Sequence, residues 1–174
     1  IQFFDTILHP GDAITTQERG VEHSVEVKHV PPILLVKEEE MLSKEEARSR
    51  LGVPQSAEVW YVQLGAGQIN DIESEIRLTI DALLEHDSEL FIVIGESLLG
   101  KRVSFSNERV RILRDYPNAI YFKGFDYSIQ AGGYNSFHEM RSSQIPTIFY
   151  PNMNTGMDDQ LARCRVAEKE GWGL

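Results

Sequence analysis

The chain has 174 residues, of which 41% are hydrophobic and 25% are charged, and its formal net charge is -10. This length and composition suit one domain with a core of its own and argue against intrinsic disorder. The acidic balance disfavours nucleic acid and anionic membrane surfaces as partners, because both are bound through basic patches that neutralise phosphates.

Cysteine, histidine and apolar runs narrow the class further. Cys164 is the single cysteine, which excludes an internal disulfide and suits a reducing compartment. The histidines show no paired spacing typical of zinc sites, and we predict no metal site. The longest apolar run falls short of the ~20 residues of a membrane helix, and no signal peptide is visible. We therefore expect a cytoplasmic protein. Any association with a membrane is expected to come from an amino-terminal half outside this segment.

The first 35 residues carry turn and linker chemistry, including HPGD at 9–12 and VPP at 30–32. Such residues discourage regular structure. We interpret residues 1–35 as a linker or the remnant of a preceding amino-terminal domain, and residues 36–174 as the folded domain.

Strand-like and helix-like segments then alternate. Ser43 and Glu46 form a capping box and Gly52 a stop signal, which predicts a short helix. The remaining predicted elements are a strand within 58–67, a helix over 71–85, a strand over 90–95, a helix over 106–115, strands over 119–122 and 127–131, a helix over 136–143, a strand over 146–150 and a helix over 158–171. Continuous apolar strands followed by helices predict an α/β fold with a doubly wound, mostly parallel sheet.

Two glycine clusters fall at the carboxyl ends of predicted strands, where such sheets bind ligands. Gly65 and Gly67 follow the strand within 58–67, but Asn70 stands where a dinucleotide fingerprint needs its third glycine. These glycines serve either a tight turn into the next helix or an open floor for a phosphate or sugar. An NAD oxidoreductase is disfavoured by the broken fingerprint.

The second cluster, Gly132 and Gly133, directly precedes a helix whose first turn begins at Tyr134. Free backbone amides and the helix dipole make that corner a candidate diphosphate site. Asn135 and Ser136 either add donors or simply cap the helix.

One turn further along the same helix, Glu139 can accept both hydroxyls of a ribose, or it is a solvated helix residue. We interpret the neighbouring His138 as a surface or packing residue. At the start of the last helix, Asp159 and Gln160 are either routine capping residues or readers of sugar hydroxyls. Arg163 either balances a phosphate or pairs with an acid.

In order and spacing, the glycine loop, GGYNSFHE, IPTIFYPN, DDQLAR and AEKEGWG together resemble the carboxyl-terminal, donor-binding half of GT-B glycosyltransferases. The similarity covers about residues 30–174. Within that group the chain is most similar to the family 28 branch, which contains lipid-intermediate N-acetylglucosaminyltransferases and galactolipid synthases.

The resemblance implies that the Rossmann-like half of an inverting glycosyltransferase binds a nucleoside diphosphate sugar, most simply a UDP-sugar. It implies diphosphate contacts at Gly132, Gly133, Tyr134, Asn135 and Ser136, ribose contact at Glu139, sugar contact at Asp159 and Gln160, and a donor loop at Gly65, Gly67 and Gln68. Binding is expected to need neither a cofactor nor a metal. The acceptor site and catalytic base are expected on an amino-terminal domain or partner chain, so the isolated chain should not turn over.

Two alternatives keep the fold but change the function. A nucleotide-sugar epimerase uses the same architecture, with Asp158, Asp159 and His138 as the available groups. A non-catalytic donor-binding subunit of a split glycosyltransferase would instead dock on a partner.

Overall fold

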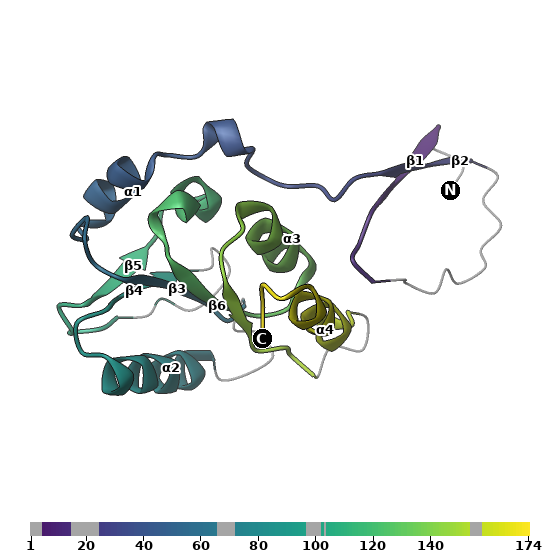
Figure 1. Cartoon of the computed structure of the whole chain (residues 1–174). Coiled ribbons are helices and arrows are strands. Elements are labelled where there is room, and N and C mark those ends of the chain that lie inside the picture. The colour runs from purple at the N-terminus through teal and green to yellow at the C-terminus, as the bar shows by residue number, and fades with distance from the viewer. Residues whose placement is uncertain (1–4, 15–24, 66–71, 97–101, 103, 154–157) are drawn as a thin grey trace.

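The computed structural model describes residues 5–14, 25–65, 72–96, 102, 104–153 and 158–174. Its centre is a five-stranded sheet in the order β5-β4-β3-β6-β7, with every neighbouring pair parallel (Figure 1). The strands are β3 (Val59–Gln63), β4 (Phe91–Gly95), β5 (Val110–Leu113), β6 (Tyr127–Gln130) and β7 (Thr147–Phe149). The predicted α/β fold with a parallel sheet is confirmed.

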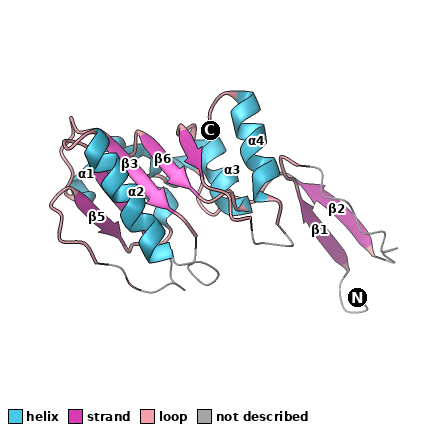
Figure 2. Cartoon of the chain, turned by 90° about the horizontal axis from the view of Figure 1, so that it is seen from below, coloured by secondary structure: helices cyan, strands magenta, loops and turns pink. Residues whose placement is uncertain are grey.

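Helices cover both faces of this sheet. Figure 2 shows α2 (Ile72–His86) lying across one face, where Ile76 and Ile80 join the buried residues of β3 and β4. The other face carries α1 (Lys44–Leu51), the 3-10 helix η2 (Asn118–Gly124), α3 (Tyr134–Ser143) and α4 (Gln160–Glu170). All five residues of β4 are buried, as expected for a strand covered on both sides. No helix in the described residues is both long and apolar enough to span a bilayer.

The short helix α1 forms as its capping residues predict. Ser43 Oγ accepts from the Glu46 amide at 3.2 Å, and Glu46 Oε2 accepts from the Ser43 amide at 3.1 Å. Gly52 ends the helix in the left-handed conformation with φ of 64°. Before α1, the 3-10 helix η1 (Glu38–Glu40) leads in from the amino-terminal segment.

An ion pair between a buried arginine and a partly exposed aspartate lies at the amino-terminal edge of the sheet. Arg48 of α1 donates to Asp126 at 2.6 Å and to the Gly124 carbonyl at 2.9 Å. Asp126 also accepts from Lys44 at 2.8 Å and from the Val59 amide at 2.9 Å. The Arg48 side chain is only 2% exposed, so this network ties α1 firmly to the entries of β3 and β6.

Two predicted elements are wrong. The helix predicted over 106–115 is the strand β5, because Asn107 makes a turn: its Oδ1 accepts from the Arg109 amide and its carbonyl from the Val110 amide. Val110–Leu113 then pairs with β4, and this pairing outweighs local helix propensity. The strand predicted over 119–122 is part of η2, whose aromatic residues pack on α1 and the core.

Regular structure in the first 35 residues was also not predicted. There, β1 (Thr6–Pro10) and β2 (Glu26–Val30) form a separate two-stranded parallel ribbon. Figures 1 and 2 show the ribbon projecting from the rest of the molecule. None of its residues is buried, so pairing between β1 and β2 rather than a core defines the ribbon.

Candidate functional site

A cavity of about 420 Å³ lies at the carboxyl-terminal edge of the sheet. Its walls come from four parts of the chain: the end of β3, the turn before η2 with η2 itself, the first turns of α3, and Ile33–Leu35 of the amino-terminal segment. Gln63, Asn118, Asn135, Ser136 and Glu139 supply its polar groups. Because parallel sheets bind ligands at this edge, the cavity is the candidate site.

The start of α3 combines a packed glycine with an open one. A Cβ on Gly132 would lie 2.7 Å from Cys164 Sγ and 3.0 Å from the Gln160 carbonyl oxygen, so this glycine allows α4 to approach closely. Gly133 is the N-cap, has no side-chain capping bond, and leaves more room, since its nearest neighbour would be 3.9 Å away.

The first turn of α3 presents free donors beside the cavity. The amides of Tyr134, Asn135 and Ser136 make no hydrogen bond to any described part of the chain. The Asn135 side chain is exposed and lines the cavity together with that of Ser136. Free amides with the helix dipole behind them suit an anionic ligand.

Glu139 lies one turn deeper on the same side of α3 and borders the cavity. Its carboxylate has no hydrogen-bond or ion-pair partner within the described residues, and burial alone raises its pKa to about 7. Burial also raises the pKa of Tyr61, with a smaller contribution from the charge on Glu139. A half-buried carboxyl without a partner is typical of a site that awaits hydrogen-bond donors from a ligand.

Polar side chains of β3, β6 and η2 form a group at the carboxyl end of the sheet, which we call the floor residues; of this group, Gln63 and Asn118 line the cavity. Asn118 Nδ2 donates to Tyr61 Oη at 3.1 Å, and that hydroxyl donates to Gln63 Oε1 at 2.9 Å. Gln130 pairs in register with Gln63 on the next strand and is fully buried, yet neither its Oε1 nor its Nε2 has a partner among the described residues. Unpaired buried amides are rare in proteins, and this one strengthens the case for a site at this edge.

These floor residues were not predicted. The signal for two of them is present in the sequence, because the apolar runs VWYVQ and YSIQ both end in glutamine at the predicted carboxyl end of a strand. Register places Gln63 and Gln130 side by side, which spacing along the chain does not reveal.

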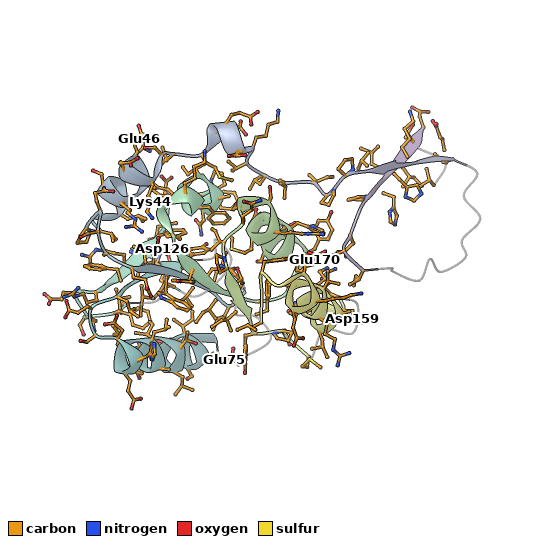
Figure 3. The ribbon with its side chains drawn as sticks, in the orientation of Figure 1. Lys44, Glu46, Glu75, Asp126, Asp159 and Glu170 are labelled. Atoms are coloured by element: carbon orange, nitrogen blue, oxygen red, sulfur yellow. The ribbon has the colours of Figure 1, made fainter. Side chains whose placement is uncertain are left out.

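The predicted sugar-binding residues lie at the start of α4. Asp159 is exposed (Figure 3), and its Oδ1 accepts from the Ala162 amide at 2.9 Å as a helix cap. Gln160 is mostly buried; its Oε1 accepts from the Asn152 amide at 2.8 Å and its Nε2 donates to Asp158 at 3.3 Å. Both residues have capping or packing roles here, and their contact with a sugar stays a prediction.

Arg163 also lies on α4, next to the glycine corner. It donates to both oxygens of Asp12, to Asp158, and to the Gly132 carbonyl at 3.3 Å. Its side chain is 5% exposed. Arg163 thus pairs with acids in this structure, and its role opposite a phosphate stays a prediction.

The first glycine loop is described only in part. Gly65 has φ of +100°, a conformation that favours glycine, and open space surrounds the position of a Cβ. Gly67 and Gln68 lie outside the described residues.

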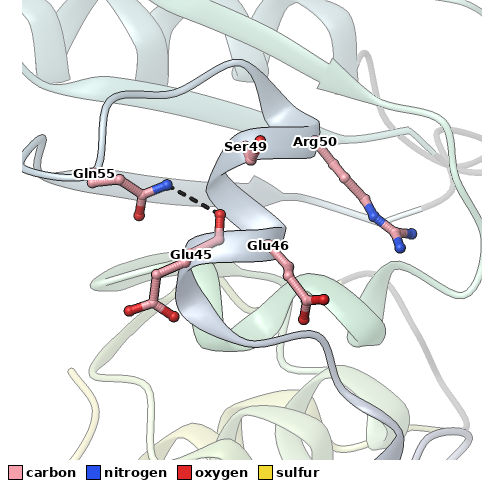
Figure 4. Close-up of a pocket in the computed structure, with 5 residues that line it drawn as sticks. All are labelled: Glu45, Glu46, Ser49, Arg50 and Gln55. Atoms are coloured by element: carbon pink, nitrogen blue, oxygen red, sulfur yellow. Dashed lines mark hydrogen bonds between the residues drawn. The ribbon is translucent and has the colours of Figure 1, made fainter.

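A second depression of about 470 Å³ lies on α1, lined by Glu45, Glu46, Ser49, Arg50 and Gln55 (Figure 4). Gln55 Nε2 donates to the Glu45 carbonyl at 3.0 Å, and Glu46 is used in the helix cap. The depression lies on α1, away from the carboxyl ends of the strands, and two of its polar side chains are already bonded, so we place the candidate site in the first cavity. Among the described residues, no group of three or more His, Cys, Asp or Glu side chains is placed to hold a metal ion.

Comparison with known proteins gives similarity in structure but not in sequence. No known protein-family profile matches the sequence, and no curated protein is significantly similar to it. Solved glycosyltransferase structures are similar over much of the chain. The glycotransferase of kitacinnamycin has a TM-score of 0.54 and 18% identity, and SnogD from Streptomyces nogalater has 0.53 and 17%. The spinosyn forosaminyltransferase SpnP has 0.56 and 14%.

The aligned regions cover 68% of this chain for the first two structures and 88% for the third. They cover 30%, 30% and 38% of the neighbours, so the chain spans about a third of their length. The parallel sheet, its flanking helices and these neighbours agree: the chain has the Rossmann-like fold found in one half of a GT-B glycosyltransferase.

Proposed function

We propose that the chain is the donor-binding domain of an inverting glycosyltransferase. It would bind a nucleoside diphosphate sugar, with UDP-sugar as the first candidate, for transfer to an acceptor held by another domain or chain. The observation that carries the proposal is a single cavity that brings together the free amides of α3 and the unpaired carboxyl of Glu139.

We assign each part of the donor to groups at this edge. The diphosphate would lie against the amides from Gly133 to Ser136, where the helix dipole stabilises the charge that grows as the sugar departs. The ribose hydroxyls would donate to Glu139. The base would lie towards Tyr116 and Asn118, which line the opposite wall of the cavity. The sugar would extend towards Asp159 and Gln160.

Charge stabilisation by the helix end supplies the role that a metal has in other transferases, so the proposed reaction needs no metal. In an inverting transfer, the acceptor oxygen attacks the anomeric carbon as the bond to the diphosphate breaks. A base must take the acceptor proton, and we expect this base outside the present chain. We also propose that the protein is cytoplasmic and that it is related to the family 28 branch.

The ribbon of β1 and β2 supports an acceptor site on another body. Parallel sheets are normally covered on both faces, whereas no residue of this ribbon is buried. A two-stranded sheet is also marginal by itself. Both features suit strands that belong to a larger sheet, supplied by an amino-terminal domain or by a partner as in a split enzyme.

The proposal is tested by titrating uridine diphosphate and its sugars into the chain while amide signals are followed by NMR. We expect shifts at Gly133, Ser136 and Glu139, with weak affinity because one wall of the cleft is missing. Glu139→Gln should weaken binding about tenfold, since it loses a charge-assisted hydrogen bond. Glu45→Gln on α1 is the matched control. Absence of any shift at millimolar ligand would refute the donor site.

The pKa of Glu139 provides an independent test. Ribose hydroxyls donate to the ionised carboxylate, but below pH 7 the raised pKa keeps Glu139 protonated in the free protein. Uridine is the ligand of choice because it has no phosphate that ionises in this pH range. Its affinity should therefore rise from pH 6 to pH 8 and then level off. The same series on Glu139→Gln should be flat. If the affinity of the unmodified chain for uridine does not change with pH, Glu139 does not bind the ribose.

A further inference from the structure

The amino-terminal segment straddles α3. Figure 1 shows the part after β2 passing over α3 towards η1, while the part after β1 descends beside α3 and α4. The first part, Ile33–Leu35, forms a wall of the cavity next to Ser136 and Glu139. The second part, Gly11–Ala13, contacts the other flank of α3 at Tyr134 and His138.

The contact after β1 is centred on the carboxylate of Asp12. Arg163 Nε lies 3.0 Å from each Asp12 oxygen, and Arg163 Nη2 lies 2.8 Å from Oδ2. Asp12 Oδ1 is also 3.1 Å from His138 Nε2 and accepts from the Ala13 amide at 2.7 Å. These side chains are 10% exposed or less, so the ion pair lies in the interior.

Two further contacts connect Asp12 to the glycine corner. The Tyr134 hydroxyl donates to the Gly11 carbonyl at 2.8 Å. Arg163 donates to the Gly132 carbonyl, so the guanidinium that holds Asp12 also holds the peptide preceding the free amides. Ala13 packs against the main core, which anchors this part of the segment to the domain.

A buried ion pair of this kind contributes little net stability, because desolvation offsets the attraction, but it fixes one arrangement of the groups that it joins. At Asp12 the groups joined are the amino-terminal segment, α3 and α4. The segments that follow β1 and β2 thus both reach α3, at Tyr134 and at the cavity wall beside Ser136 and Glu139.

We propose that Asp12 is a positioning residue for the donor site. Its pairing with Arg163 and His138 sets the segment over α3, and thereby places both the Ile33–Leu35 wall and the Gly132–Tyr134 corner for the ligand. The proposal rests on the proposed function in one respect, namely that the ligand of this cavity is a nucleotide. A domain or partner that moves the ribbon of β1 and β2 would therefore change donor affinity through the pair of Asp12 and Arg163.

The test uses the whole chain with Asp12→Asn, which keeps the shape of the side chain and removes its charge. Without ligand, the NMR signals of Ile33, Leu34 and Leu35 should shift or broaden. Affinity for uridine diphosphate, measured by calorimetry, should fall about tenfold, which is the size of an ordinary coupling between sites. Asp12→Glu retains the charge and should restore part of the affinity.

The matched control is Asp126→Asn, which disrupts the other buried arginine–aspartate pair at the amino-terminal edge. It should lower stability but leave the Ile33–Leu35 signals and the affinity unchanged. Unchanged wall signals in Asp12→Asn, or equal changes in Asp126→Asn, would overturn the positioning role. If the unmodified chain fails to bind the nucleotide, the proposed function fails, and the ligand-free signals still decide on Asp12.

Discussion

The two edges of the sheet each carry a nearly buried arginine paired with an aspartate, and they differ in what surrounds the pair. At the amino-terminal edge, Arg48 and Asp126 bond to each other and to neighbouring backbone groups, so the edge is closed. At the carboxyl-terminal edge, Arg163 and Asp12 bond to each other on one flank of α3 and the cavity lies on its other flank, and several groups at this edge have no partner among the described residues.

Those unbonded groups are the α3 amides, the carboxyl of Glu139 and the amide of Gln130. A buried polar group without a partner destabilises a fold, so stability does not explain the unbonded side chains of Gln130 and Glu139. The same ion-pair chemistry therefore serves the fold at one edge, and we propose that it serves ligand binding at the other.

The largest expected effect is a loss of stability when the ion pair at the amino-terminal edge is removed. Arg48→Met leaves the carbonyls of Gly124, Gln55 and Ala57 without their Arg48 donor and removes one of the partners of Asp126. We expect a loss of about 3–5 kcal/mol in the free energy of unfolding, measured by urea denaturation. If that variant does not fold, Asp126→Asn provides a milder version. A loss below about 1 kcal/mol would show that this edge is not the structural one.

At the other edge, Glu139→Gln should increase the free energy of unfolding rather than decrease it. The pKa of Glu139 is about 7 in the folded protein against an ordinary value of 4.5, so between these values the folded state binds more protons. The free energy of unfolding therefore decreases as pH rises from 4.5 to 7, by about 3 kcal/mol in total. Urea denaturation at pH 8 should show the variant more stable than the unmodified chain by up to about this amount.

At pH 3 the carboxyl is almost fully protonated in both states, so the two proteins should then be about equally stable. The exposed Glu45→Gln serves as the control and should change stability little at either pH. A Glu139→Gln protein that is less stable at pH 8 would mean that the carboxylate has a stabilising partner.

The two adjacent glycines sharpen the comparison within the carboxyl-terminal edge. Gly132→Ala places a methyl group 2.7 Å from Cys164 Sγ and should destabilise by about 1–3 kcal/mol in thermal or urea unfolding. Gly133→Ala has room and a backbone conformation that alanine tolerates, with φ of -65° and ψ of 157°, so its effect on stability should be within about 0.5 kcal/mol. Equal losses for both variants would contradict the distinction between a packed and an open glycine.

A further small effect is expected at Asp159. Removing its capping bond to Ala162 with Asp159→Ala should cost about 1 kcal/mol of stability. If Asp159 also hydrogen-bonds the sugar, Asp159→Ala should decrease the affinity for a UDP-sugar and leave the affinity for UDP itself unchanged. Asp159→Asn retains the cap and serves as the control for stability. An equal decrease for both ligands would leave Asp159 as a cap alone.

Local signals in the sequence predicted much of the fold. The capping box of Ser43 and Glu46 predicts α1 because its bonds form within four residues. The apolar run LFIVIG predicts β4 because a fully buried strand needs apolar side chains on both faces. The glycine pair and Glu139 locate the candidate site because strand ends and helix starts meet at one edge of a parallel sheet.

Where long-range pairing overrides local preference, the sequence alone misleads. Residues 110–113 form a strand because β4 offers an open edge, and β1 and β2 form because they pair with each other across more than a dozen residues. His138 was interpreted as a surface or packing residue, and it is buried; Asp12, its partner, lies 126 positions away. Such partners have no sequence spacing by which to recognise them.

The sequence by itself determined the class of fold, the edge that carries the candidate site and the helix whose first turn faces it, because hydrophobic periodicity and glycine position act over a few residues. Only the tertiary structure decided that Gly132 is packed while Gly133 is open, that Glu139 has no partner in the part of the chain that the structure describes, and that Asp12 reaches Arg163. These features depend on which segments meet in space, and burial and the loss of water there set the charge, pairing and freedom of each group.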